Sequence, residues 1–135
     1  MILAACIDDC MGLAFNSRRQ SRDRAVYAEL AAMAHGAAIW TDERSAPLFD
    51  GLGCNIQSCG DFSEKAGTGE YCFLEFHSPA QFESRTEKII LYRWNRRYPS
   101  DLKFDIDLSC WRLESSVEFA GFSHEKITKE VYIRE

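Results

Sequence analysis

The run Ile2-Leu3-Ala4-Ala5-Cys6-Ile7, which ends at Asp8-Asp9, decides the fold. A short continuous apolar run bounded by polar residues is typical of a central strand that is covered on both faces of its sheet. A second run of this kind, Ile89-Ile90-Leu91-Tyr92, lies in a predicted strand over residues 87–94. Together the two runs indicate an α/β protein with a buried sheet.

Strand and helix signals alternate between these two runs. A helix is predicted where Val26, Leu30 and Met33 recur at helical spacing, with Ser21 or Asn16 as its N-cap and a glycine as its stop. Further strands are predicted at residues 37–41, 55–58 and 71–76, short helical segments at residues 43–49 and 79–83, and a loop at residues 10–20.

The C-terminal part has a different pattern. Apolar and polar residues alternate in residues 111–114, 117–119 and 127–134, which is typical of half-exposed antiparallel strands. We therefore predict one α/β domain over residues 1–135, with a mainly parallel central sheet, flanking helices and a C-terminal antiparallel hairpin. A length of 135 residues suits one domain.

The composition narrows the classes of function. A net charge of −5 opposes general nucleic-acid binding, which needs a basic surface. No apolar run is long enough for a membrane span. The N-terminus has no basic leader of a secretory signal, so we expect a cytoplasmic protein whose thiols are reduced.

Several segments resemble the dihydrofolate reductase family. Residues 88–94, residues 98–107 and Trp111 resemble its late segment, where a strand leads to a Gly-Asp-Thr-x-Phe-Pro stretch and a tryptophan opens the next strand. Asp101 and Phe104 match that stretch, and its other positions differ. The resemblance implies a shortened dihydrofolate reductase-like fold. It also implies NADPH-dependent reduction as one candidate activity.

The resemblance reaches further along the chain. Asp23 falls near the family's catalytic carboxylate, and Ser123-His124, before the last strand, fits the family's terminal hairpin. A buried Asp23 could be a proton donor, because burial raises the pKa of a carboxyl group. Alternatively, it is an ordinary acidic residue at the start of a helix, where the helix dipole stabilises it. Asp23 is thus the catalytic candidate.

Two departures from the family affect the cofactor. The family has a Gly-Gly pair after the strand that matches residues 71–75, and this chain has Phe76-His77 there. The family's Gly-Arg pair after the second strand is replaced by Thr41-Asp42-Glu43, although Arg44 follows. Bulk and negative charge both oppose a diphosphate, which needs close backbone amides and positive charge. We therefore expect no cofactor and no hydride transfer, with NADPH as the alternative.

A second resemblance is more local. Residues 16–23 and 91–96 match an Asn-x-Arg-Arg-Gln-Ser-x-Asp loop and a Leu-Tyr-x-Trp-Asn-Arg strand of small uncharacterised bacterial proteins, sometimes catalogued as "ribonuclease Z". That enzyme uses a His-x-His-x-Asp-His zinc motif, whereas His35, His77 and His124 are far apart in this sequence. The cysteine spacings C-x3-C and C-x4-C are also unlike zinc ribbons. We expect no metal site.

The basic residues around the start of the first helix form the most unusual local feature. Arg18, Arg19, Arg22 and Arg24 lie where cations oppose the positive end of a helix dipole, so an anion there would be stabilising. The alternative is a solvated cluster balanced by nearby carboxylates. Arg18, Arg19 and Arg22, together with Tyr92 and His124, are the candidate ligand-binding residues.

Three functions remain open on the sequence alone. The first is a cytosolic domain that binds a small anionic or nucleotide-like ligand without hydride transfer. The second is an NADPH-dependent reductase of the dihydrofolate reductase type, with Asp23 as its acid. The third is a protein-interaction module or homodimer that uses an exposed edge strand or aromatic surface.

Overall fold

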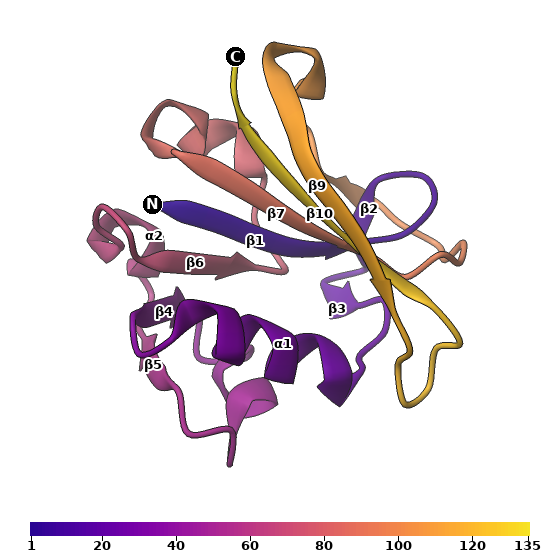
Figure 1. The fold of residues 1–135 in the computed structure, drawn as a ribbon, viewed down its shortest axis with the longest axis horizontal. Helices are drawn as coiled ribbons and strands as arrows, with labels where there is room; N and C mark the ends of the chain where they lie inside the picture. The colour runs from indigo at the N-terminus through magenta and orange to yellow at the C-terminus, as the bar shows by residue number, and fades with distance from the viewer.

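One seven-stranded sheet forms the centre of the computed structural model, which describes residues 1–135 (Figure 1). The order across the sheet is β5 (Asn55–Ser58), β4 (Ala38–Thr41), β6 (Tyr71–Leu74), β1 (Ile2–Ile7), β7 (Lys88–Arg93), β10 (Ile127–Arg134) and β9 (Trp111–Phe119). The first five of these strands are parallel, and β10 is antiparallel to both of its neighbours. The predicted α/β class, with a mainly parallel sheet and a C-terminal antiparallel hairpin, is confirmed.

A small second sheet lies in the segment that was predicted as a loop. It consists of β3 (Arg18–Arg19), β2 (Gly12–Phe15) and β8 (Leu102–Lys103), in that order. The loop prediction for residues 10–20 is therefore wrong. The physical reason is the two-residue turn: Asn16 and Ser17 have φ angles of 52° and 58°, and such left-handed residues join antiparallel strands tightly.

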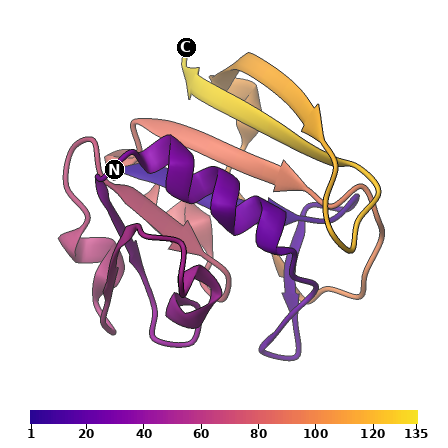
Figure 2. The same ribbon diagram turned by 60° about the horizontal axis from the view of Figure 1, so that its bottom comes forward.

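The principal helix, α1 (Arg24–Ala34), crosses one face of the sheet (Figure 2). Its N-cap is Asp23, whose side chain accepts a hydrogen bond from the amide of Ala25, so the predicted caps Ser21 and Asn16 are wrong. The helix ends at His35, in the left-handed conformation, before Gly36. None of the helices has the length and apolar character needed to cross a bilayer.

The remaining helical segments are short. They are η1 (Ala46–Phe49), α2 (Phe62–Lys65), η2 (Pro79–Arg85) and η3 (Leu108–Cys110), of which α2 and η3 were not predicted. Two apolar cores cover the two faces of the sheet. In the first, Tyr27 of α1 and Phe49 of η1 pack edge-on against Phe73 of β6 and are tilted relative to each other. These contacts hold α1 over the sheet and fix its N-terminal end beside the strand ends.

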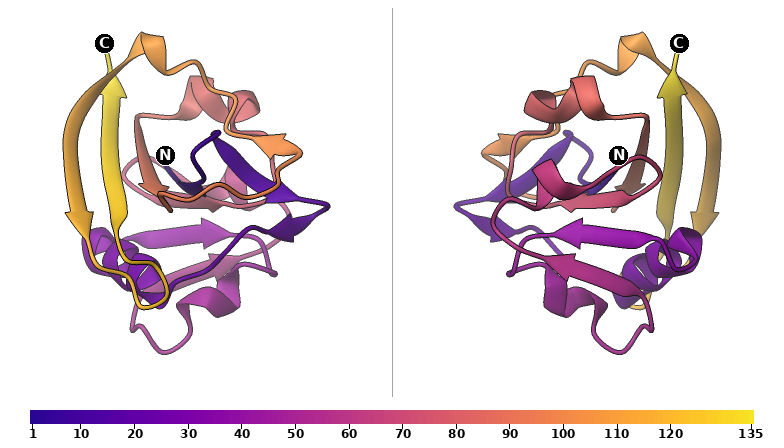
Figure 3. Two further views of the ribbon diagram at one scale, coloured as in Figure 1. Left: turned by 90° about the vertical axis from the view of Figure 1, so that its right-hand side faces the viewer. Right: turned by 90° about the vertical axis from the view of Figure 1, so that its left-hand side faces the viewer.

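The long β9–β10 hairpin forms one edge of the sheet (Figure 3). β10 is paired on both sides, but β9 is paired only with β10. Leu113 and Val117 of β9 are 48% and 55% exposed, and Phe122 in the loop that follows is 81% exposed. The edge is thus both unpaired and partly apolar. The loop between β9 and β10 reaches back to the start of α1, where the candidate site lies.

Candidate functional site

The polar residues that follow the parallel strands gather at one end of the sheet. In open α/β sheets, ligands bind beyond the carboxyl ends of the strands. Here Asp8 follows β1, Thr41 ends β4 and Glu75 follows β6, and all three side chains are buried. Two cavities lie among the loops that leave this end of the sheet.

The first, which we call the arginine cavity, lies between the start of α1, η1 and the β9–β10 loop. Its volume is about 340 Å³. It is lined by Arg19, Arg22, Asp23, Arg24, Tyr27, Arg44, Pro47, Leu48, Phe122 and Ser123. Four arginines therefore face one aspartate, in a chain whose net charge is −5. This concentration of positive charge departs from the charge of the molecule as a whole.

The four arginines differ in what already neutralises them. Arg19 forms a two-point ion pair with Glu75, at 2.8 Å from Nε and 2.7 Å from Nη2. Arg24 donates only to the backbone oxygen of Asp50, at 3.1 Å. Arg44 likewise donates to a backbone oxygen. The ion pairs of the structure leave Arg22 without a carboxylate partner. Three of the four positive charges are therefore not neutralised by a carboxylate.

Asp23 joins the start of α1 to the β9–β10 loop. Its carboxylate, which is 3% exposed as a residue, accepts hydrogen bonds from the amides of Ala25, Phe122, Ser123 and His124. It also accepts one from Nδ1 of His124, at 3.0 Å. The hydroxyl of Ser123 also donates to it, at 3.2 Å, so the carboxylate is surrounded by donors of the protein itself.

These bonds determine the ionisation of Asp23. Burial alone would raise the pKa of its carboxyl group, but hydrogen bonds, led by those from the Phe122 amide and the His124 ring, outweigh burial. The pKa of Asp23 is consequently held well below the usual range of an aspartate. A permanently ionised group is a poor proton donor. The geometry therefore favours the helix-start interpretation of Asp23 over the catalytic-acid interpretation.

The β9–β10 loop approaches Asp23 so closely that one position requires glycine. A Cβ atom added at Gly121 would collide with Oδ2 of Asp23 and lie 2.8 Å from the backbone oxygen of His124. The Gly121 amide in turn donates to that oxygen, at 2.9 Å. Gly121 thus allows the loop to close on the carboxylate.

His124 is buried between this carboxylate and three other side chains. Its ring stacks on Trp94, with centroids 4.5 Å apart and planes inclined by 23°. Because Nδ1 faces the Asp23 carboxylate, Nε2 is the acceptor for the hydroxyl groups of Ser21, at 3.0 Å, and Tyr98, at 3.2 Å. The residue is 3% exposed. It lies beneath the arginine cavity, behind the lining residue Asp23, and does not line the cavity itself.

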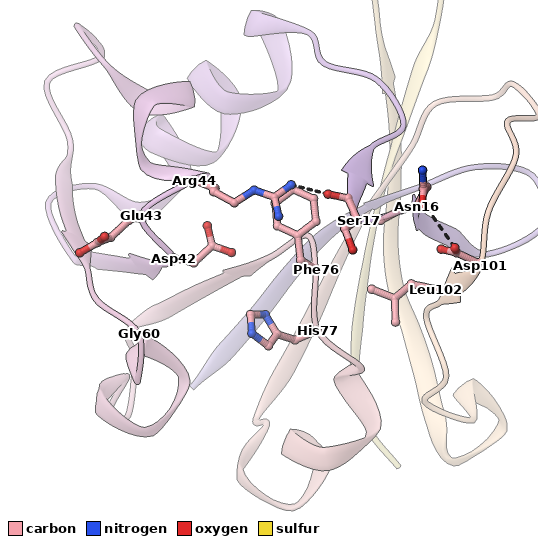
Figure 4. Close-up of a pocket in the computed structure, with 11 residues that line it drawn as sticks. Asn16, Ser17, Asp42, Glu43, Arg44, Gly60, Phe76, His77, Asp101 and Leu102 are labelled. Atoms are coloured by element: carbon pink, nitrogen blue, oxygen red, sulfur yellow. Dashed lines mark hydrogen bonds between the residues drawn. The ribbon is translucent and has the colours of Figure 1, made fainter.

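The second, large cavity has a volume of about 700 Å³. It is lined by Ala14, Asn16, Ser17, Asp42, Glu43, Arg44, Gly60, Phe76, His77, Asp101 and Leu102 (Figure 4). The guanidinium of Arg44 lies 3.7 Å from the ring centre of Phe76, and Figure 4 shows the two groups side by side in the middle of the cavity. Since Arg44 lines both cavities, it is part of the wall between them.

The large cavity contains the two segments in which the sequence departs from the reductase family. Phe76 and His77 from the end of β6 lie near Asp42 and Glu43 from the end of β4 (Figure 4). With Asp101, three carboxylates line this cavity against one arginine. Two chain segments that are about thirty residues apart in sequence thus contribute bulk and negative charge to one space.

The structure brings only some of the predicted ligand residues together. Arg19 and Arg22 line the arginine cavity, and His124 lies directly beneath it. Arg18 is exposed on β3 and lines no cavity. Tyr92 is fully buried, with its hydroxyl bonded to Glu29, and lines no cavity either.

Sequence reasoning missed four residues of this region: Ser21, Arg44, Glu75 and Tyr98. Glu75 comes directly after a predicted strand, which is a recognisable place for a functional carboxylate. Arg44 was considered only as compensation for its acidic neighbours. No sequence signal marks Ser21 or Tyr98, because their common partner His124 is 103 and 26 positions away, respectively.

The histidines and cysteines form no common cluster. All six cysteines are free thiols. No group of three or more histidine, cysteine, aspartate or glutamate side chains is arranged to hold a metal ion. His35 ends α1, His77 lines the large cavity and His124 is buried in the β9–β10 loop.

Comparison with solved structures identifies the fold. Dihydrofolate reductase from Enterococcus faecalis, complexed with NADP(H) and RAB-propyl, is similar to this chain, with a TM-score of 0.63. The fold is that of dihydrofolate reductase. The match covers 100% of this chain and 96% of the other, at 11% sequence identity, so the likeness concerns the fold alone. No protein-family model and no curated protein sequence matches the chain.

Proposed function

We propose that this protein binds a small anionic, nucleotide-like ligand in the arginine cavity and does not transfer a hydride. One observation carries the proposal: four arginines line a cavity of about 340 Å³ whose single carboxylate, Asp23, is already saturated with hydrogen bonds. Charge-assisted hydrogen bonds from guanidinium groups are the strongest that a protein offers to phosphate or carboxylate.

The rest of the lining favours a ligand with a flat apolar part. Tyr27, Leu48 and Phe122 supply apolar surface on the same cavity. Small-molecule sites combine such surface with a few well-placed polar groups. A phosphate or carboxylate facing Arg22 and Arg24, with a ring against Phe122, satisfies both requirements. This chemistry is that of a nucleotide or of a similar aromatic acid.

The reductase alternative is less well supported by the charges. The solved structure is described as a complex with NADP(H), but the departures in this chain line the large cavity with Asp42 and Glu43, and Asp101 adds a third carboxylate. Like charges at contact range cost about a few kcal/mol at the dielectric of a protein surface. Moreover, the proton donor of this alternative, Asp23, has a lowered pKa.

Calorimetric titration tests the proposal. The panel contains inorganic phosphate, AMP, dihydrofolate and NADPH, each added to the full chain. We expect AMP or phosphate to bind, and Arg22→Ala to weaken that binding by about 1.5–3 kcal/mol, or roughly tenfold to a hundredfold. Arg18→Ala is the matched control, because Arg18 is a neighbouring arginine outside every cavity.

Two results would contradict the proposal. One is a panel in which no anion binds. The other is an equal loss of binding in Arg18→Ala and Arg22→Ala, which would indicate a diffuse charge effect and not a site. Tight NADPH binding, with oxidation of NADPH in the presence of dihydrofolate, would instead favour the reductase.

A second candidate function, self-association, is favoured by the edge strand. β9 is unpaired on its outer side, and Leu113 and Val117 are about half exposed there. Exposed edge strands pair readily with another chain, and a second copy offers an identical antiparallel strand. Light scattering of the wild type and of Val117→Lys distinguishes the cases. A dimer that becomes a monomer supports the second candidate, and a wild-type monomer rejects it.

A further inference from the structure

Ser21, His124 and Asp23 are connected by hydrogen bonds in the order of a nucleophile, a base and an orienting carboxylate. Oγ of Ser21 lies 3.0 Å from Nε2 of His124, and Nδ1 of the same ring lies 3.0 Å from Oδ2 of Asp23. Nucleophilic serines are activated by this arrangement on several unrelated folds, whatever the order of the residues along the chain. We propose that Ser21 is a nucleophile for acyl transfer from carboxylic esters.

The hydrogen bonds fix the roles of the two ring nitrogens. The carboxylate of Asp23 is held ionised and can only accept, so the hydrogen of the neutral imidazole is on Nδ1. Nε2 therefore carries the lone pair, and it faces the hydroxyl of Ser21. The hydrogen bond between His124 and Asp23, which we call the clamp, closes the β9–β10 loop on the start of α1. It thus also sets the tautomer that a general base requires.

The ring is held in place independently of any substrate. It stacks on Trp94 and is 3% exposed, whereas Ser21 is partly exposed to solvent. A buried base beside a reachable hydroxyl is the exposure pattern that a nucleophilic site needs.

Tyr98 contributes a second hydroxyl at the same nitrogen, at 3.2 Å from Nε2. Its backbone amide is fixed at 2.9 Å from the buried carboxylate of Asp8. One lone pair accepts only one hydrogen in full, so when Ser21 donates to Nε2, the Tyr98 hydroxyl can donate elsewhere. It is then a donor for the oxygen of a reacting carbonyl group.

The chemical steps balance with water as the co-reactant. Oγ of Ser21 forms a bond to the ester carbonyl carbon while its proton passes to Nε2 of His124. The bond from that carbon to the leaving oxygen breaks, and His124 returns the proton to the departing alcohol. Water then attacks the acyl carbon, His124 takes one proton from it, and the acid leaves as Ser21 recovers its hydrogen.

A neutral alkyl fluorophosphonate tests the nucleophile directly. Attack by Ser21 forms a P–O bond and breaks the P–F bond, with the proton on His124 and fluoride released. We expect one adduct per folded chain, located on Ser21 by peptide mass. Ser21→Ala should show no adduct and an unchanged melting temperature, and Ser116→Ala, an exposed serine of β9, should react like the wild type.

His124→Asn separates the base from the clamp, since the asparagine amide can still donate to Asp23 but has no nitrogen lone pair for Ser21. We expect a folded protein that reacts at least a hundredfold more slowly, the usual contribution of a positioned base. Hydrolysis of p-nitrophenyl acetate should fall in parallel in Ser21→Ala. The absence of an adduct on the folded wild type, or an adduct on Tyr98, would overturn the proposal.

This inference is independent of the proposed ligand site. The phosphonate is neutral and needs no arginine, so Arg18→Ala, at an arginine outside every cavity, should react normally. Failure of phosphonate labelling would leave phosphate binding intact. Conversely, failure of every titration would leave the labelling result intact.

Discussion

The arginine cavity and the large cavity share Arg44 but have opposite charge. The arginine cavity has four arginines against one carboxylate, and that carboxylate is buried and fully hydrogen-bonded. The large cavity has one arginine against Asp42, Glu43 and Asp101. Within one dihydrofolate reductase-like fold, two neighbouring cavities therefore have linings of opposite charge. The difference teaches that a fold supplies cavities, while the side chains at the strand ends decide which of them can accept an anion.

The aspartates of the two cavities differ in burial: Asp23 is buried, whereas Asp101 is exposed. Replacing each with alanine should therefore change the free energy of unfolding by different amounts. Asp23→Ala deletes a buried carboxylate and leaves four backbone amides and a histidine without their acceptor. We expect a loss of about 3–5 kcal/mol in the free energy of unfolding. Asp101→Ala removes an exposed acceptor of one amide and should cost about 1 kcal/mol. Urea unfolding measures both, and equal losses would remove the distinction between the cavities.

Acid should lower the free energy of unfolding through Asp23, the carboxylate of the arginine cavity. The pKa of Asp23 is lower in the folded state than its ordinary value of about 3.9, so the ionised group stabilises the fold. This stabilisation is complete above about pH 4 and is lost as the pH falls from there towards the folded-state pKa. The free energy of unfolding of Asp23→Asn should therefore fall less steeply than that of the wild type below pH 4. Parallel curves in acid would show that Asp23 is not the group responsible.

Glu75→Gln should increase the difference in charge between the two cavities, because it removes the carboxylate that neutralises Arg19. In the wild type, Glu75 neutralises Arg19 through two short hydrogen bonds. Glutamine keeps the shape and can still contact Ser45, but Arg19 would then be free to face an anion. We expect phosphate affinity to rise by about 1 kcal/mol, roughly fivefold, measured by calorimetry. Unchanged or weaker binding would mean that Arg19 does not contribute to the cavity's field.

The smallest expected effect comes from a partial reversal of the negative charge that lines the large cavity. Glu43→Lys replaces one of its three carboxylates with a cation and should raise NADPH affinity a few-fold, through about 1 kcal/mol or less for an exposed charge. Fluorescence titration of NADPH measures the change, with Glu64→Lys on α2, a residue that does not line the cavity, as a control. Tight NADPH binding by the wild type would break the comparison altogether.

The sequence predicted the sheet well because burial on both faces leaves a direct signal. The apolar runs in β1 and β7 and the alternation in β10 were sufficient to place those strands and the final hairpin. The β2–β3 hairpin was missed because its turn depends on left-handed Asn16 and Ser17, which resemble any polar loop. Local propensity does not report a conformation that two neighbouring strands stabilise.

The candidate site was only partly predictable for a different reason. Arg19 and Arg22 could be singled out because charge at a helix start is a local signal. Tyr92 was a less informative choice, since a tyrosine inside a central strand is covered from both sides. The association of Asp23 with His124 depends on a loop that folds back over the helix start, and no pattern within either segment specifies it.

The clamp between Asp23 and His124 joins two distant parts of the chain and therefore forms late in folding. The two residues are 101 positions apart, and β10, which follows His124, is paired on both sides. Contacts between such distant segments form late, because the chain must first close a long loop. A chain emerging from the ribosome thus has most of its parallel strands before it has either a closed arginine cavity or an oriented imidazole. The binding and the chemistry that we propose for this end of the molecule both depend on the β9–β10 loop, so both await the last strand.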